Sequence, residues 1–243
     1  MGDTLRTQLT SLAHRHGGTL FMVLFAAFQI LLRYHTEEHD IVVGTNVANR
    51  NRVETEEMVG FFINQLVLRT DLSGDPSFVE LLGRVRETTL GAYAHQDLPF
   101  DLLVAELQPE RTMSRSPLYQ VLFTLQNAPM PPLSIQNLTL WPFEIPARTA
   151  KFDLVLTLLE TDDSLIETIE YDDELFDKAR IIRMLEQYEL ILSQAAACPE
   201  VKLSQMDKRI SKFEEERNRN EKKALQALSA DKLERLRHRA VAN

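Results

Sequence analysis

The chain contains six histidines, the side chains best suited to acid–base catalysis and metal binding near neutral pH. His35 and His39 are four positions apart, but the order His-Thr-Glu-Glu-His differs from the His-Glu-x-x-His of zinc hydrolases. We expect both in a solvated turn between a helix and a strand. His14 and His16 lie at the end of a predicted helix, where positive charge is favourable. These four residues therefore indicate no metal site.

Other reactive side chains give no catalytic pattern either. Ser114 and Ser116 have no partner histidine in a nucleophile-like arrangement, and neither lies in a Gly-x-Ser-x-Gly elbow. No phosphate-binding glycine loop is present. The one cysteine, Cys198, has no partner for a disulfide and no metal-ligand spacing, so we expect a small buried residue in a protein of the reducing cytoplasm. The sequence predicts no self-contained active site.

Composition excludes two classes of partner. The net charge of -9 argues against a nucleic-acid binder, because such proteins usually carry a basic excess. The apolar run Leu20–Leu32 is shorter than the roughly 20 residues that cross a bilayer. We therefore expect no membrane or nucleic-acid partner.

Apolar periodicity, caps and turn residues predict an α/β chain with a sheet that is at least partly parallel. The expected helices are Asp3–His14, Leu20–Tyr34 capped by Thr19, one from Phe78 to about Ala94, Phe100–Leu107, and one from the Asp177 cap to Ala197. The expected strands are Asp40–Thr45, Gly60–Arg69, Tyr119–Gln126, Asp153–Leu159 and Leu165–Tyr171, the last two forming an antiparallel hairpin.

Two segments stand apart from this pattern. Five prolines between Ala128 and Pro146 indicate a connector with one embedded strand. From about residue 205 the composition becomes charged, so we predict a domain over 1–204 and a helical linker or docking tail over 205–243. Within that tail, Ser229 is expected to cap a second short helix.

Several motifs occur in the order found in the second half of nonribosomal peptide synthetase condensation domains. They are Gly60-Phe-Phe-Ile-Asn-Gln, His95-Gln-Asp-Leu-Pro-Phe-Asp and Arg111-Thr-Met-Ser-Arg-Ser-Pro-Leu. The resemblance is continuous over roughly Leu5–Leu203. It assigns structural roles to the following motif residues: Gly60, His95, Gln96, Asp97, Pro99, Phe100, Arg111, Ser114, Arg115 and Pro117.

The resemblance implies a chloramphenicol-acetyltransferase-like fold, with a mixed sheet, helices packed on it, and one lobe of a two-lobe V. That family has its catalytic histidine in an earlier His-His-x-x-x-Asp-Gly motif, and this sequence contains no adjacent histidines. The chain thus resembles the C-terminal, acceptor-side lobe, without catalytic residues and inactive alone. Its implied partners are the N-terminal lobe and carrier proteins, whose phosphopantetheine arms present the thioesters that become an amide; no cofactor or metal is implied.

Alternatives stay open for the lobe interface. Arg50 either pairs with the aspartate of the missing motif or is exposed on a polar turn. Asn64 and Asn127 either donate to ligands in the tunnel between the lobes or cap local backbone. The segment Ser134–Phe143 is predicted to be a strand that the first lobe's sheet would receive. At the level of function, the alternative is a non-catalytic scaffold that holds carrier proteins or a partner synthetase.

Overall fold

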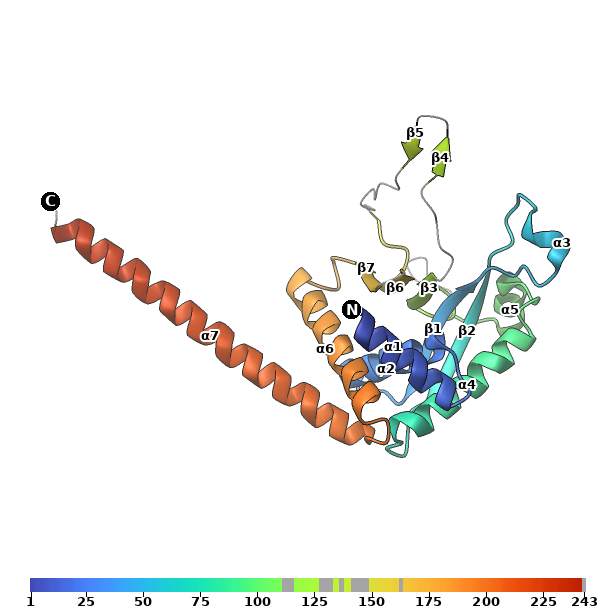
Figure 1. The fold of residues 1–243 in the computed structure, drawn as a ribbon, viewed down its shortest axis with the longest axis horizontal. Coiled ribbons are helices and arrows are strands. Elements are labelled where there is room, and N and C mark those ends of the chain that lie inside the picture. The colour runs from blue at the N-terminus through green and yellow to red at the C-terminus, as the bar shows by residue number, and fades with distance from the viewer. Residues whose placement is uncertain (111–115, 127–132, 136–137, 141–148, 162–163, 242–243) are drawn as a thin grey trace.

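The computed structural model describes residues 1–110, 116–126, 133–135, 138–140, 149–161 and 164–241. Figure 1 shows a body of helices and strands from which one long helix extends. The helices are α1 (Asp3–Arg15), α2 (Leu20–Thr36), α3 (Val53–Glu56), α4 (Phe78–Ala94), α5 (Phe100–Leu107), α6 (Lys178–Ala197) and α7 (Leu203–Val241). The strands are β1 (Asp40–Val47), β2 (Asn64–Asp71), β3 (Val121–Gln126), β4 (Leu133–Ile135), β5 (Leu138–Leu140), β6 (Leu154–Glu160) and β7 (Leu165–Tyr171).

Five strands form one mixed sheet in the order β2-β1-β3-β6-β7. The central pairs β1–β3 and β3–β6 are parallel, whereas the outer pairs β1–β2 and β6–β7 are antiparallel. The prediction of a partly parallel sheet closed by a β6–β7 hairpin is confirmed. The prediction that the second strand starts at Gly60 is wrong, because pairing with β1 begins at Val47–Asn64 and residues 60–63 lie beyond the ladder.

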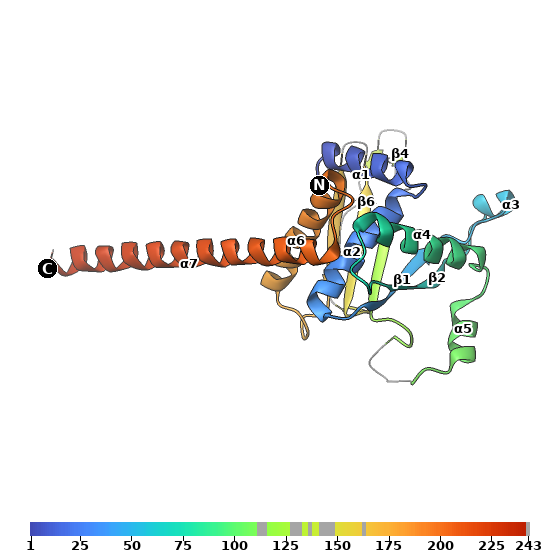
Figure 2. The ribbon, with the colours of Figure 1, turned by 90° about the horizontal axis from the view of Figure 1, so that it is seen from below.

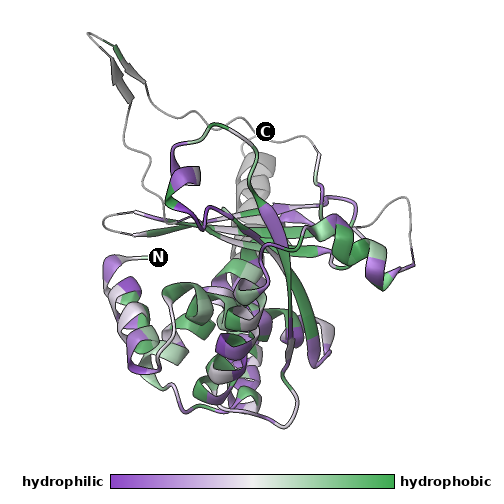
Figure 3. Cartoon of the chain, turned by 90° about the vertical axis from the view of Figure 1, so that its right-hand side faces the viewer, coloured by the Kyte–Doolittle hydropathy of each residue, from purple (hydrophilic) through white to green (hydrophobic). Residues whose placement is uncertain are grey.

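The core lies between the sheet and the helices on one of its faces (Figure 3). Eleven consecutive residues of α2, Met22–Leu32, are buried, as expected of a helix that is apolar on every side. Phe123 of β3 lies with its ring centroid 5.4–5.6 Å from those of Phe21, Phe25 and Phe28. On the other face, alternate residues of β6 and β7 are only partly covered, so this face is open to solvent along those strands.

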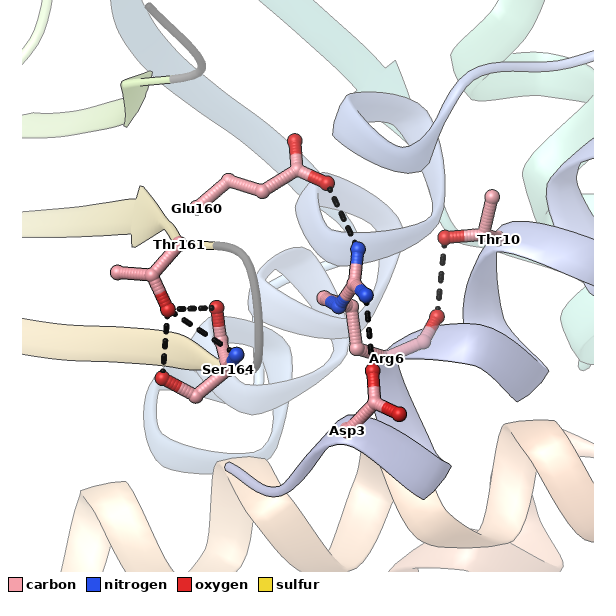
Figure 4. Close-up of polar contacts among 6 residues, drawn as sticks. All are labelled: Asp3, Arg6, Thr10, Glu160, Thr161 and Ser164. Atoms are coloured by element: carbon pink, nitrogen blue, oxygen red, sulfur yellow. Dashed lines mark hydrogen bonds and ion pairs between the residues drawn. The ribbon is translucent and has the colours of Figure 1, made fainter. Parts of the chain in front are cut away.

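Local sequence signals set the helix ends. Thr19 Oγ1 accepts from the Met22 N–H and Asp177 Oδ1 from the Arg180 N–H, so both predicted caps are confirmed. Ser77 and Glu80 add a capping box at the start of α4. Figure 4 shows how α1 is joined to the hairpin: Arg6 Nη1 lies 3.4 Å from Glu160 Oε1, and Arg6 Nη2 lies 2.8 Å from Asp3 Oδ1.

Two predicted elements differ from the structure. The connector holds two short strands, β4 and β5, paired with each other and not with the main sheet, instead of one strand. Residues 136–137 and 141–143 of the predicted strand Ser134–Phe143 lie outside the described residues. The tail holds a single continuous helix, α7, in which Ser229 is an interior residue rather than a cap.

Individual side chains differ too. Cys198 is exposed, not buried, because the chain leaves α6 there. His35 lies inside α2 and contacts α6, so the expected solvated turn is wrong for it. Among the described residues, no single helix is long and apolar enough to cross a bilayer; α1 and α2 pass only together, across a bend of 103°.

Candidate functional site

Asn64, the first residue of β2, joins two of the predicted motifs. Its amide nitrogen donates to the carbonyls of Gln96 at 2.8 Å and Leu98 at 2.7 Å. Its side-chain oxygen accepts from the N–H of Phe100 at 3.1 Å. Pro99 occupies the cap position of α5 and has no side-chain acceptor, so Asn64 caps this helix from 36 residues away. Backbone capping, one of the two alternatives for Asn64, is therefore observed.

The turn between α4 and α5 is built mainly from backbone contacts. His95 ends α4, its N–H donates to the Ala92 carbonyl at 3.1 Å, and its own carbonyl accepts from the Leu98 N–H at 3.1 Å. Asp97 Oδ1 accepts from Asn51 Nδ2 at 3.1 Å, which connects the turn to the β1–β2 loop. His95 is thus placed where a helix-terminating residue is needed.

Arg50 is held within the β1–β2 loop. Its Nη1 donates to the carbonyl of Thr55 and, at 3.4 Å, to that of Glu56. Its guanidinium lies 4.2 Å from the centroid of the Phe62 ring, a cation–π distance. Gly60 allows this approach of Phe62, because a Cβ at Gly60 would lie 3.0 Å from that ring. Arg50 is half-buried and gives the loop its shape.

The loop, the turn and α5 together expose large apolar side chains. Val59 and Phe61 are 104% and 89% exposed, and Met58 and Ile63 are more than half exposed. Leu102 of α5 adds a further exposed side chain, and Figure 3 shows α5 as a largely hydrophobic helix. We call Met58, Val59, Phe61, Ile63, Leu98 and Leu102 the apolar rim. Apolar side chains gathered at this density are typical of a surface that another protein covers.

Gly44 and Tyr119 lie beneath this region and were not identified from the sequence. The Tyr119 ring covers Gly44 so closely that a Cβ there would overlap the ring carbons. The ring also stacks on Phe152 at 5.4 Å and meets Phe100 edge-on at 5.7 Å. Burial raises the pKa of Tyr119 to about 12, and its hydroxyl has no hydrogen-bond partner in the described part of the chain. The signal in the sequence was a glycine inside a strand, which indicates close approach of another group.

The remaining site predictions are distributed as follows. Asn127, Arg111, Ser114 and Arg115 lie outside the described residues. Pro117 is half-buried in the segment that leads to β3. Among the residues that the structure describes, no group of three or more histidine, cysteine, aspartate or glutamate side chains could hold a metal ion.

Comparison with known proteins agrees with this architecture. The sequence model of the condensation domain matches residues 1–217. The chain belongs to the condensation-domain family. This condensation-domain chain is 53% identical over 201 residues to a linear gramicidin synthase of Brevibacillus parabrevis, covering 82% of the chain and 4% of that protein. It is 39% identical over 205 residues to tyrocidine synthase 3 of the same organism, covering 84% of the chain and 3% of that synthase.

Solved structures show the same fold. A four-domain nonribosomal peptide synthetase bound to AMP and glycine aligns with a TM-score of 0.76 at 24% identity, over 83% of this chain and 16% of that one. The X-domain from teicoplanin biosynthesis aligns with a TM-score of 0.72 at 28% identity, over 84% of this chain and 47% of that one. The predicted chloramphenicol-acetyltransferase-like fold is confirmed. The condensation-domain chain spans about half of the X-domain chain and a few per cent of its curated relatives.

Proposed function

We propose that this chain is the C-terminal, acceptor-side half of a peptide synthetase condensation domain and works only when a first lobe covers its apolar rim. The observation that carries the proposal is the match to about half of a solved relative's length, combined with strongly exposed apolar residues on the loop and α5. Covering a phenylalanine such as Phe61 contributes about 1.5–3 kcal/mol to association.

The reaction proposed for the complete domain joins two carrier-bound thioesters. The amine of the acceptor attacks the thioester carbonyl of the donor, a C–N bond forms, the C–S bond breaks, and the departing thiolate takes up the proton released by the amine. Such a step needs a proton-positioning group within hydrogen-bond reach of the amine. We assign that group to the first lobe. This half would supply the wall on the acceptor side, shaped by the unit that Asn64 holds together.

The test combines this chain with a separately produced first lobe from a relative such as the linear gramicidin synthase. Complex formation is measured by light scattering, and amide product is measured with two loaded carrier proteins. Phe61→Ser is expected to weaken the complex about tenfold or more, because roughly 1.4 kcal/mol corresponds to a factor of ten. Ile182→Ser, which changes an exposed apolar residue on α6, is the matched control.

The absence of both a complex and an amide product would overturn the proposal. Binding of loaded carriers by this chain alone, with no product after the first lobe is added, would favour a non-catalytic scaffold instead. In that case phosphopantetheine is a bound group and not a substrate arm.

A further inference from the structure

Helix α7 projects from the body along most of its length. Figures 1 and 2, seen at right angles to each other, both show it leaving the body beside α6. The helix has 39 residues, which gives a length of about 58 Å at 1.5 Å per residue. Only its first turns belong to the core, where Met206 and Ile210 are fully buried.

The first anchor of α7 lies at its N-terminus. The Asp75 carboxylate accepts from the N–H and the hydroxyl of Ser204, each at 2.8 Å. The N–H of Leu203 donates to the Pro76 carbonyl at 3.1 Å. Asp75 adopts a positive φ of 49°, so its backbone is bent at the point where it meets α7. The starts of α4 and α7 are therefore fixed to each other.

A chain of polar side chains forms the second anchor, further along the helix. Glu214 accepts from Gln187 Nε2 at 2.5 Å and from the Tyr34 hydroxyl at 3.1 Å. The other side-chain atom of Gln187, Oε1, lies 2.7 Å from His35 Nε2. Gln187 is fully buried, so its hydrogen bonds cannot be replaced by water without opening the α6–α7 contact.

Two ion pairs flank this chain of contacts. Arg33 of α2 pairs with Asp207, and Arg217 pairs with Glu186 of α6. The pair of Arg217 with Glu186 is the last described polar contact between α7 and the body. The next one, from Arg217 to Glu221 at 2.9 Å, is internal to the helix.

We propose that α7 is a rigid positioning arm whose direction is set by the Glu214–Gln187–His35 contacts and the Arg217–Glu186 ion pair at its base. The arm holds whatever docks on its far half at a fixed place relative to the lobe. From Arg217 to Val241 the free part measures about 36 Å, so a tilt of about 10° at the base moves the far end by about 6 Å. A small change in the base contacts therefore has a large effect at the far end.

The experiment measures the direction of the arm in the full chain by pulsed electron paramagnetic resonance. Cys198 is the one cysteine and is exposed, so Cys198→Ser leaves a background for spin labels at Lys178→Cys on α6 and Ala227→Cys on α7. The unaltered base should give one narrow distance distribution. The double variant Glu214→Ala/Arg217→Ala should broaden it at least about twofold, since both contacts to α6 are lost.

Glu215→Ala is the matched control, because Glu215 is the exposed neighbour of Glu214 on the same helix. Circular dichroism and thermal melting check that each variant stays folded, and Arg217→Ala alone replaces the double variant if that one does not. A broad distribution for the unaltered base, or equal widths for the base variant and the control, would overturn the proposal. Neither result depends on whether amide formation is observed with a first lobe.

Discussion

The side-chain oxygen of Asn64 accepts a hydrogen bond at 3.1 Å from the backbone N–H of Phe100, the first residue of α5. Two motifs that are separate in the sequence are thereby fixed to each other. The apolar rim spans both motifs, so its shape depends on this contact.

Replacing Asn64 should loosen the rim. Asn64→Ala removes three hydrogen bonds and is expected to lower the free energy of unfolding by about 1–3 kcal/mol, because buried backbone groups lose their partners. Asn64→Asp should lose as much, since a carboxylate cannot donate to the carbonyls of Gln96 and Leu98. Urea unfolding measures both variants. Gln65→Ala, one residue further along β2, is the control, and an equal loss there would contradict the assignment.

Gly44 should not tolerate a side chain. Gly44→Ala places a Cβ against the Tyr119 ring and is expected to cost about 1–3 kcal/mol, as in other overpacked cores. Combining it with Tyr119→Leu should cost less than the sum of the two single changes, because both act on one contact.

The control for this series is Gly83→Ala in α4, where a Cβ meets no atom within 4 Å. That change should stabilise the chain by about 0.5–1 kcal/mol, because alanine favours a helix over glycine. Additive losses at Gly44 and Tyr119 in thermal melts would argue against the contact.

His35 should make the fold sensitive to acid. Burial, and to a smaller extent Arg180 and Arg183, lowers the pKa of His35 below its usual 6.5, although the bond with Gln187 opposes this effect. The unfolded chain then binds a proton first as the pH falls, so stability is present above about pH 6.5 and declines below it. His35→Gln should lose less stability between about pH 7.5 and 5.5 than the unaltered chain. The exposed His39→Gln serves as the control, and an unchanged slope in His35→Gln would refute the prediction.

Glu167 should act in the opposite direction. Burial, with a contribution from Glu189, raises the pKa of Glu167 from 4.5 to about 7. The folded chain keeps its proton through this range while the unfolded chain releases it, so the contribution to stability is lost as the pH rises from 4.5 to about 7. Glu167→Gln should therefore be more stable than the unaltered chain at about pH 8 and similar at about pH 4. Glu170→Gln, on the opposite face of β7, should show no such crossing in urea unfolding.

The sequence alone determined the family, most of the helices and strands, and the caps at Thr19 and Asp177. These features depend on neighbouring residues: apolar periodicity defines an element, and a side-chain oxygen at the first turn defines its start. The same reasoning located the turn from His95 to Pro99, because a helix end and a proline mark it locally.

Only the tertiary structure decided which distant residues meet. The contacts of Asn64 with Phe100, of Tyr119 with Gly44 and of His35 with Gln187 each join segments far apart in the chain, and no local pattern specifies such pairs. The second strand starts at Asn64 because its partner β1 ends there, and the start of α7 is buried because α2 and α6 offer it apolar and polar partners. Pairing and burial are properties of the assembled sheet and helices, so they could not be predicted from composition and spacing.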